Sequence, residues 1–519
     1  MPGKERPRNA IRRSATRSRK SSPPKDTDIL SVARNNFGFD QLSPGQSQAI
    51  RSLLSKSDTL VVMPTGAGKS AIYQIAGLML PGSVLVVSPL IALQKDQVDS
   101  INASDGKAEA CVVNSSLKSI ELRETLDRVG NGAYKFIFLA PEQLRKEEAI
   151  DALKQARVSM IVIDEAHCIS EWGHDFRPDY LQLGRVVDVL AHPITIAMTA
   201  TASERVRQEI IERLGMKKPR VFVGGFDRPN IYLRVDHFNE ENKKLEAVIH
   251  RVRWAEKPGI VYVATRKAAE EIMRHLVEQG IDALFYHGGL KSSERDEIQD
   301  RFMSGNAEVI VATDAFGMGI DKADIRFVYH HDVPDSLDSY YQEIGRAGRD
   351  GEKADAILFF RKEDIGAQAF HTGAGKLDPE QVNQVTAAIA EEQPVAPEEI
   401  AEKVDLSLRK LTAIIQKLAD IDAVEVLPAG EVRLSKNTDL EDAAAAVAEQ
   451  QETLKEANKE RLEQMRAYAD TSGCRREYLL RYFGDNFAGP CGNCDNCEAE
   501  HPAIDVNPSL GVRLEVSNN

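Results

Sequence analysis

The stretch "MPTGAGKS", Met63 to Ser70, combines small residues with a lysine and a hydroxyl in a spacing suited to phosphate binding. Glycines let backbone N–H groups surround phosphates, Lys69 can reach the β- and γ-phosphates, and Ser70 can ligate Mg²⁺. Met63 stands where the strict pattern has glycine. The motif still follows an apolar run and precedes a helical pattern, as a phosphate-binding loop between a strand and a helix should. The motif predicts a nucleotide site formed by Thr65, Gly66, Ala67, Gly68, Lys69 and Ser70.

Two adjacent carboxylates, Asp164 and Glu165, follow the apolar run "MIVI". A phosphate-binding loop lacks a metal ligand and a group that activates water, and this pair can supply both. We expect Asp164 to coordinate Mg²⁺ and Glu165 to polarise the attacking water. A solvated acidic pair is the alternative, which the preceding apolar run disfavours.

A third candidate is the arginine pair in "YYQEIGRAGRDG", Tyr340 to Gly351. On a helix, Arg346 and Arg349 would share a face, with small residues around them that permit close approach. An arginine presented across a domain cleft can stabilise charge on a γ-phosphate. Taken alone, the pair also suits a surface salt bridge.

Four of the six cysteines lie near the C-terminus: Cys474, Cys491, Cys494 and Cys497, the last three as C-x-x-C-x-x-C. Four thiolates suit a closed, structural Zn²⁺ site. The same spacing also occurs in iron–sulfur ligation. A disulfide is less favoured, because the isolated Cys111 and Cys168 fit a reducing compartment.

The elements that must position these groups are short β-branched runs alternating with helical patterns, in two successive blocks. This pattern predicts an α/β fold of two parallel-sheet domains with ligands at the carboxyl ends of the strands, in the cleft between the blocks. The predicted strands lie within residues 59–64, 83–89, 136–141, 160–164 and 194–201 of the first block, and 259–265, 283–288, 309–314 and 327–332 of the second.

The formal charge of −14 is unevenly distributed. Met1 to Lys25 carries nine Lys or Arg against one Glu, a net +8, so the rest of the chain carries −22. We expect this tail to be disordered, as either a solubilising extension or a polyanion-binding arm. Apolar runs fall short of the ~20 residues of a spanning helix, and the tail lacks a secretory h-region. We expect a cytoplasmic protein, nucleoid-associated if bacterial.

Together the motifs resemble superfamily 2 helicases. The ordered set is "MPTGAGKS", "SPLIALQKDQ", "APEQL", "DEAH", "MTATA", "VYVATRK", "YHGGLKSSER", "VATDAFGMGIDK" and "QEIGRAGRDG". The aromatic-rich loop "CISEWGHDFRPDY" after DEAH and the cysteine set narrow the resemblance to the RecQ family of DNA helicases. It covers roughly residues 37–360 and 474–497.

The resemblance implies two RecA-like domains and ATP-driven 3′ to 5′ movement on single-stranded DNA, with duplex unwinding in DNA repair and recombination. ATP and Mg²⁺ would be cofactors, and "YLLRYFGDNF" between the cysteines favours Zn²⁺ over iron–sulfur. Partners would be single-stranded and tailed or forked DNA, with a single-strand-binding protein or repair proteins possible. Gln46 would contact adenine and Phe39 would stack on it, while Ser43 replaces the usual arginine.

The loop after DEAH has an expected role of its own. Trp172 and Phe176 suit base stacking and Arg177 suits a phosphate, so DNA in this loop could move the carboxylates or His167. We therefore expect the loop to matter more for coupling than for binding. The alternative is that both aromatics belong to the core.

Residues 379–436 read as three helices and a hairpin, a winged-helix-like module with Arg409, Lys410 and Lys417 on its third helix. Its acidic composition leaves scaffold and DNA-reading roles both open. The expected organisation is a basic tail (1–27), two RecA-like domains (28–225 and 226–372), the winged-helix-like module (373–438), a helical zinc module (439–502) and a C-terminal tail (503–519).

Only 22 residues follow the last cysteine. We therefore expect neither the terminal winged helix nor the C-terminal helical domain that many members of the family have. Two alternative functions stay open: a DNA-stimulated ATPase or translocase with weak unwinding, and a winged-helix and zinc DNA-binding regulator with a degenerate motor.

Overall fold

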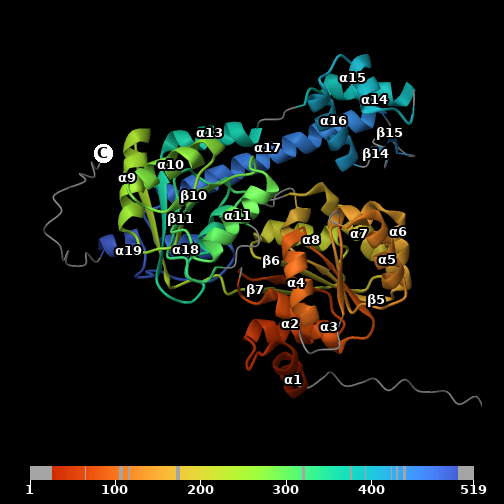
Figure 1. Ribbon diagram of the computed structural model, residues 1–519, viewed down its shortest axis with the longest axis horizontal. Helices are drawn as coiled ribbons and strands as arrows, with labels where there is room; N and C mark the ends of the chain where they lie inside the picture. Colours follow the sequence, from red (N-terminus) through yellow and green to blue (C-terminus); the bar gives the residue numbers. More distant parts are fainter. Residues whose placement is uncertain are drawn as a thin grey trace, which may run out of the picture.

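The computed structural model describes residues 26–500 except 65, 90, 104–108, 115–116, 171–175, 318–321, 374–376, 392, 422, 428–430 and 436–439. Two parallel-sheet domains lie side by side, and the long helix α17 (Leu440–Asp470) runs from the second domain to a small helical module (Figure 1). No helix within the described ranges combines the length and apolar character needed to cross a membrane.

The first domain is a seven-stranded parallel sheet with the order β3-β4-β2-β5-β6-β1-β7. The inner strands are almost wholly buried, as expected for a parallel sheet covered by helices on both faces. The strands are β1 (Thr59–Val62), β2 (Ser83–Val87), β3 (Ala110–Val113), β4 (Phe136–Leu139), β5 (Val158–Ile163), β6 (Ile194–Thr199) and β7 (Arg220–Val223).

Helices of the first domain follow its strands in the alternating order that the sequence predicts. They are α1 (Asp26–Phe37), α2 (Pro44–Leu54), α3 (Lys69–Met79), α4 (Ile91–Ala103), α5 (Ser119–Gly130), α6 (Glu147–Gln155), α7 (Leu183–Val189) and α8 (Glu204–Arg213), with 3₁₀ turns η1 (Pro141–Arg145), η2 (Ala166–Ile169) and η3 (Pro178–Tyr180). Helix α1 begins inside the segment expected to be a tail to residue 27, and residues 1–25 lie outside the described part.

The second domain is a six-stranded parallel sheet with the order β10-β11-β9-β12-β13-β8. Its strands are β8 (Ile231–His237), β9 (Gly259–Tyr262), β10 (Ala283–Tyr286), β11 (Val309–Ala312), β12 (Phe327–His330) and β13 (Ala354–Phe360). Its helices are α9 (Glu241–Trp254), α10 (Arg266–Glu278), α11 (Ser292–Met303), α12 (Leu337–Ile344) and α13 (Lys362–Gly373).

All nine strands expected from the sequence are present. The structure adds β3, β7, β8 and β13, which the sequence reading did not single out. For β7 there is a physical reason: it is a four-residue edge strand whose side chains are mostly exposed, so neither an apolar run nor a buried alternation marks it. Strands β3, β8 and β13 do have buried or alternating patterns.

The small module has the three helices and hairpin that the sequence predicts: α14 (Pro379–Glu391), α15 (Pro397–Lys403), α16 (Leu408–Asp420), β14 (Val424–Val426) and β15 (Val432–Leu434). A left-handed turn at Asp405 (φ 49°) separates α15 from α16. The module has its own apolar core, which Val447 of α17 joins, whereas Met465 and Tyr468 at the other end of α17 belong to the core of the large domains. The 31-residue helix, about 46 Å long, therefore connects two separate cores.

The end of α17, α18 (Arg475–Tyr482) and α19 (Asp495–Glu500) form a second small unit packed on the second domain. The Arg475 guanidinium donates to Asp495 at 2.5 Å and to the Tyr468 carbonyl at 3.0 Å. The Phe483 ring lies 5.0 Å from that of Phe226 and 4.8 Å from that of Tyr341. Arg475 thus joins the parts of this unit to one another, and aromatic packing of Phe483 fixes the unit to the second domain.

Candidate nucleotide site and zinc centre

The phosphate-binding loop connects the carboxyl end of β1 to the amino end of α3. Gly66 and Gly68 have φ of 82° and 73°, a left-handed backbone that favours glycine. A Cβ atom on Gly68 would lie 2.4 Å from Gln46 Nε2, so a larger residue would displace the Gln46 side chain as well as strain the backbone. Thr65, predicted for the same site, lies outside the described residues.

Gln46 connects the phosphate loop to helix α2. Its Nε2 donates to the carbonyls of Ala67 at 3.1 Å and Gly68 at 3.3 Å, and its Oε1 accepts from the Ser43 N–H at 2.9 Å. Ser43 in turn caps α2 by accepting from the Gln46 N–H at 3.3 Å, so the residue in place of the family's arginine has a structural role. An adenine contact by Gln46 remains a prediction.

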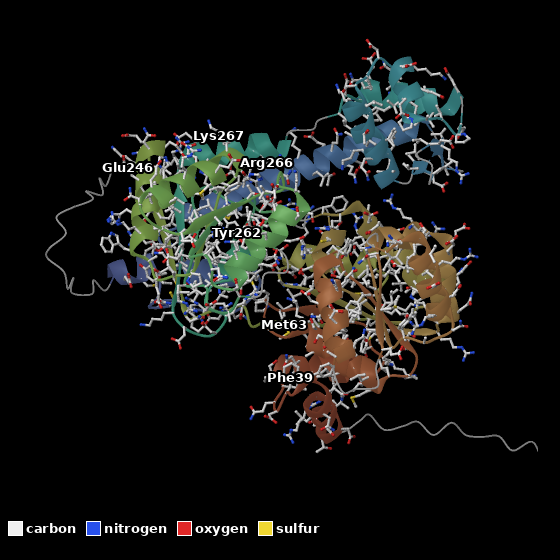
Figure 2. All side chains as sticks on the ribbon, in the orientation of Figure 1. Phe39, Met63, Glu246, Tyr262, Arg266 and Lys267 are labelled. Atoms are coloured by element: carbon white, nitrogen blue, oxygen red, sulfur yellow. The ribbon has the colours of Figure 1, made fainter. Side chains whose placement is uncertain are left out.

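Two residues beside this loop bear on nucleotide binding. Phe39 is 42% exposed and stacks on Phe37 with ring centres 6.3 Å apart. The Met63 methyl group would lie 2.9 Å from a Cβ atom on Gly45, so this methionine packs against a glycine of α2. Both side chains lie on the first domain (Figure 2), and Phe39 is accessible for the predicted stacking.

The two carboxylates of DEAH, which follow β5, lie close enough to Lys69 to affect its charge. Burial lowers the pKa of Lys69, and the charges of Glu165 and Asp164 oppose that shift. Burial, followed by the Glu165 charge, raises the pKa of Asp164 to about 7. Glu165 has a left-handed backbone (φ 46°), which for a non-glycine residue is typical of a functional turn.

The two residues predicted to hold Mg²⁺ both act on Tyr73. A hydrogen bond from Ser70 lowers the pKa of Tyr73 and the Asp164 charge raises it, after the larger effect of burial, and Ser88 Oγ donates to Asp164 Oδ2 at 3.2 Å. Hydroxyl and carboxylate oxygens are the donors that Mg²⁺ prefers. Ser70 and Asp164 would therefore hold Mg²⁺, which would offset charge on the phosphates, while Lys69 Nζ, now 2.9 Å from the Met63 carbonyl, can turn to the same phosphates.

A chain of hydrogen bonds leads from DEAH to the second domain. His167 Nδ1 lies 2.8 Å from Thr199 Oγ1, and that hydroxyl donates to the Thr201 carbonyl at 2.9 Å. Because the single hydroxyl proton is committed to Thr201, the proton of the His–Thr contact must be on His167 Nδ1. Gln342 Nε2, from α12, donates to Thr201 Oγ1 at 3.3 Å. Thr199, Thr201 and Gln342 were not assigned to the site, although they lie in "MTATA" and "QEIGRAGRDG".

The prediction that Arg346 and Arg349 share a helical face is wrong. Helix α12 ends at Ile344, and both arginines lie in the following turns, where Gly348 adopts a left-handed φ of 56°. Arg346 is buried, donates to the Gly317 carbonyl and contacts the Tyr262 hydroxyl. Because the backbone leaves the helix before Arg346, the three-residue spacing no longer places the two side chains on one helical face.

Arg349 reaches the first domain instead. A Cβ atom on Gly66 would lie 4.0 Å from Arg349 Cδ, and the Arg349 charge lowers the pKa of Lys69 after the larger effects of burial and the carboxylates. These two observations place a cation of the second domain against the phosphate loop of the first. The structure thus brings together Lys69, Asp164, Glu165 and Arg349, while Arg346 supports the second domain.

The aromatic loop is tied to the carboxylates at its far end. The Arg177 N–H donates to the Cys168 carbonyl at 2.9 Å, and the Tyr180 hydroxyl donates to the Asp164 carbonyl at 3.0 Å. Phe176 and Arg177 are partly buried, and Trp172 lies outside the described residues. A movement of the loop would therefore be felt at the backbone of Asp164, while the coupling role itself remains a prediction.

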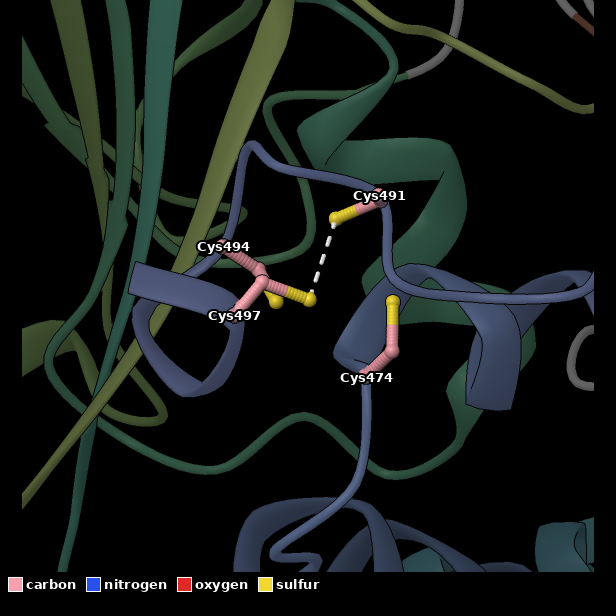
Figure 3. Close-up of side chains that lie close together, drawn as sticks. All are labelled: Cys474, Cys491, Cys494 and Cys497. Carbon is pink, nitrogen blue, oxygen red and sulfur yellow. Dashed lines mark hydrogen bonds between the residues drawn. The ribbon is translucent and has the colours of Figure 1, made fainter. Parts of the chain in front are cut away.

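The four C-terminal cysteines form one cluster, with Sγ atoms within 4.8 Å of one another (Figure 3). Tetrahedral Zn–S bonds of about 2.3 Å place sulfurs about 3.8 Å apart, and the Cys491–Cys497 distance is 3.9 Å. Gly492 makes the tight turn between them with φ of 64°. Four thiolates converging without an open position fit a structural metal site.

A second group of possible metal ligands consists of Glu241, His331 and Asp332. Lys244, whose side chain is fully buried, already places its ammonium there, 3.2 Å from Asp332, 3.0 Å from Asp364 and 3.3 Å from Glu241. A built-in cation at the centre of three carboxylates makes this cluster a salt-bridge network of the second domain.

Family models match three parts of the chain. A DEAD/DEAH box helicase domain matches residues 43–210, a helicase conserved C-terminal domain matches residues 242–351, and a RecQ zinc-binding domain matches residues 432–498. These matches cover the phosphate loop with DEAH, the arginine loop and the cysteine cluster, in that order.

Curated relatives extend over most of the chain. A probable ATP-dependent DNA helicase RecS of Bacillus subtilis is 36% identical over 467 residues, 89% of this chain and 90% of that protein. The RecQ helicase of the same bacterium is 34% identical, covering 92% of this chain and 68% of its own length. The chain belongs to the RecQ family of ATP-dependent DNA helicases. It spans 63% of the 36% identical RecQ of Pasteurella multocida.

Solved structures agree on the fold of this RecQ-family chain. The helicase MrfA bound to DNA has a TM-score of 0.56 at 18% identity, covering 82% of this chain and 64% of MrfA. The helicase Lhr of Mycobacterium smegmatis, bound to single-stranded DNA and AMP-PNP, has a TM-score of 0.51 at 21% identity, covering 81% and 61%. Similarity at this level supports the two RecA-like domains.

Family membership also decides between the two metals left open by the cysteine spacing. The RecQ zinc-binding match includes all four cysteines, so the cluster is a zinc site, and ATP and Mg²⁺ are the cofactors of the motor. The RecQ-family chain is an ATP-hydrolysing enzyme, and the alternative of a regulator with a degenerate motor is excluded.

The zinc centre leads to a prediction about folding. Cys494→Ser removes a fully buried ligand, so zinc content should fall to near zero and the thermal unfolding temperature should drop, because structural zinc supplies roughly 10 kcal/mol or more of coupled folding energy. Metal analysis and thermal unfolding measure both. As a control, Cys111→Ala removes a buried thiol in the first domain and should keep the wild-type zinc content. A wild-type zinc content in Cys494→Ser would contradict the assignment of the cluster as the zinc site.

Proposed function

We propose that this protein uses ATP hydrolysis to move 3′ to 5′ along single-stranded DNA and to separate duplex DNA during repair and recombination. The observation that carries the proposal is the position of Arg349, a residue of the second domain, against the phosphate loop of the first. Hydrolysis that needs groups from both domains depends on their closure, and cycles of closure and opening can advance a strand held by both.

Each residue then has a proposed role in the hydrolysis step. Lys69 and the loop N–H groups bind phosphates, Ser70 and Asp164 hold Mg²⁺, and Glu165 orients and polarises the attacking water. Arg349 stabilises charge on the γ-phosphate when the cleft is closed. Gln46 and Phe39 hold the adenine, with Ser43 serving as a helix cap.

DNA sensing is assigned to the loop after DEAH. Trp172 and Phe176 would stack on bases and Arg177 would contact a phosphate. The path back to the site is short, since the Tyr180 hydroxyl is bonded to the Asp164 carbonyl. DNA bound in the loop could therefore shift the positions of Asp164 and Glu165. The His167–Thr199 contact, which leads to the second domain, offers a second route to the same carboxylates.

A second candidate is a DNA-stimulated translocase that unwinds weakly. It is favoured by the charge of the small module, where residues 373–438 contain twelve Asp or Glu against seven Lys or Arg, a net charge of −5. This net charge opposes a phosphate backbone and argues for a scaffold or protein-contact role of the module as a whole, although α16 itself has three Lys or Arg against one Asp. We also propose that the protein works with partners such as a single-strand-binding protein. Its basic N-terminal tail would bind polyanions, and the protein would act in the cytoplasm, at the nucleoid.

Strand displacement decides between these candidates. The full chain with ATP and Mg²⁺ should displace the strand from a duplex with a 3′ single-stranded tail and leave a 5′-tailed duplex intact. Lys69→Ala should bind DNA and show neither hydrolysis nor displacement, since the loop loses its phosphate cation. Normal DNA-stimulated hydrolysis without displacement would favour the translocase, and displacement only from the 5′-tailed duplex would contradict the proposed direction.

The aromatic loop provides a separate prediction, with the other tryptophan of the chain as its control. Trp172→Ala should lower DNA-stimulated ATP hydrolysis about 10-fold and change the Kd for single-stranded DNA less than about 3-fold, because coupling rather than affinity is lost. Trp254→Ala, at a 72% exposed position ending α9, should change neither. If Trp172 served only as a stacking platform, the Kd would rise by about 5- to 150-fold, the equivalent of 1–3 kcal/mol.

A further inference from the structure

The turns that carry Arg349 are held by a segment between the two domains. Once α12 ends at Ile344, the following carbonyls lack helical partners and need donors from elsewhere. The Arg228 guanidinium supplies them: Nη1 donates to the Gly345 carbonyl at 3.0 Å, and Nη2 donates to the carbonyls of Ala347 at 2.7 Å and Gly348 at 2.9 Å. A planar, permanently charged fork is well suited to fix several carbonyls at once.

A second side chain of the same segment completes the contact. Asn230 Nδ2 donates to the carbonyls of Gly348 and Glu352, each at 2.8 Å. A Cβ atom on Gly348 would lie 2.4 Å from that nitrogen, so the glycine before Arg349 is closed in by Asn230. The residue that precedes Arg349 is therefore fixed by two side chains of the inter-domain segment.

The segment is itself anchored to the zinc module. Arg476, 5% exposed, donates through Nη1 to Asp227 at 2.7 Å and through Nη2 to the Ile231 carbonyl at 2.6 Å. Phe226 stacks on Phe483 at 5.0 Å, with ring planes 13° apart. Asp227 and Ile231 lie on either side of Arg228, so the zinc module restrains both ends of the short stretch that fixes the arginine turns.

We propose that Arg228 is a positioning residue for ATP hydrolysis, acting through Arg349. Its three hydrogen bonds hold the turns at residues 345–348 so that Arg349 enters the phosphate loop, and the zinc module steadies Arg228 through its neighbours. Within the described part of the chain, Arg228 donates to these turns and not to the phosphate loop, so its effect on hydrolysis passes through the turns. The inference rests on the proposed role of Arg349 in hydrolysis.

The test is Arg228→Ala in the full zinc-loaded chain, assayed for ATP hydrolysis with saturating single-stranded DNA. A catalytic group displaced by about 1 Å costs up to 100-fold in rate, so kcat should fall about 10- to 100-fold while KM for ATP changes little. Zinc content and the Kd for single-stranded DNA should stay at wild-type values. Arg234→Ala, on the adjoining strand and paired with Asp236 at 2.6 Å, should leave kcat unchanged.

A double-mutant cycle separates positioning from a merely structural role. If Arg228 acts through Arg349, Arg228→Ala should lower kcat little further in a chain that already carries Arg349→Ala. Arg228→Lys should have a higher kcat than Arg228→Ala, since an ammonium keeps the positive charge but not the several donors of the planar guanidinium group. Equal losses in both backgrounds, or a wild-type kcat for Arg228→Ala, would overturn the inference.

The design also covers folding and the underlying function. If Arg228→Ala loses zinc or unfolds, Arg228→Lys and Asn230→Ala replace it in the double-mutant cycle with Arg349→Ala. Losses of kcat that simply add to the loss from Arg349→Ala would then overturn the inference. A wild-type chain without DNA-stimulated hydrolysis would instead refute the proposed function. An active wild type with an unaffected Arg228→Ala refutes this inference alone.

Discussion

Arg349 of the second domain lies beside Gly66 and Lys69 of the first domain, so a cation of one domain approaches the phosphate loop of the other. This approach requires that the carboxyl ends of two parallel sheets face each other and that one loop cross the cleft between them. Gly66 supplies the left-handed backbone of the loop, and Arg349 lies within van der Waals range of the place where a Cβ atom would be. If Arg349 acts in hydrolysis as proposed, neither domain alone has a complete hydrolytic site, and a fold of two such domains can couple hydrolysis to relative movement.

The zinc module extends this arrangement beyond the cleft. It anchors the inter-domain segment through Arg476, and it also contacts the first domain, where Arg207 Nη1 donates to the carbonyls of Ala202 at 3.3 Å and Phe483 at 3.1 Å. Ala202 follows Thr201, which is bonded to Gln342 of the second domain. A structural metal site far from the nucleotide therefore stabilises contacts that connect both halves of the motor.

Much of the site could be predicted because the residues of each motif are close in sequence and determine the chemistry of that motif by themselves. Three such motifs can be interpreted without the tertiary structure: a glycine-rich loop after a buried strand, a carboxylate pair at a strand end, and four clustered cysteines. The position of Arg346 and Arg349 outside the helix could not be predicted, because three-residue spacing indicates a shared face only while the helix continues. The helix ends where tertiary contacts from Arg228 and Asn230 compensate the free carbonyls, and those contacts come from more than 100 residues away. Exposed edge strands such as β7 were missed because they have no burial pattern.

The most direct test of the central claim is the rate of ATP hydrolysis by Arg349→Ala with saturating single-stranded DNA, measured beside ATP and DNA binding. An arginine that stabilises transition-state charge across a cleft contributes about 10³-fold or more to kcat. The account predicts a loss of that order with both ligands still bound at wild-type affinity. A kcat within a few fold of the wild type would show that closure does not bring Arg349 into the reaction, and would contradict the account.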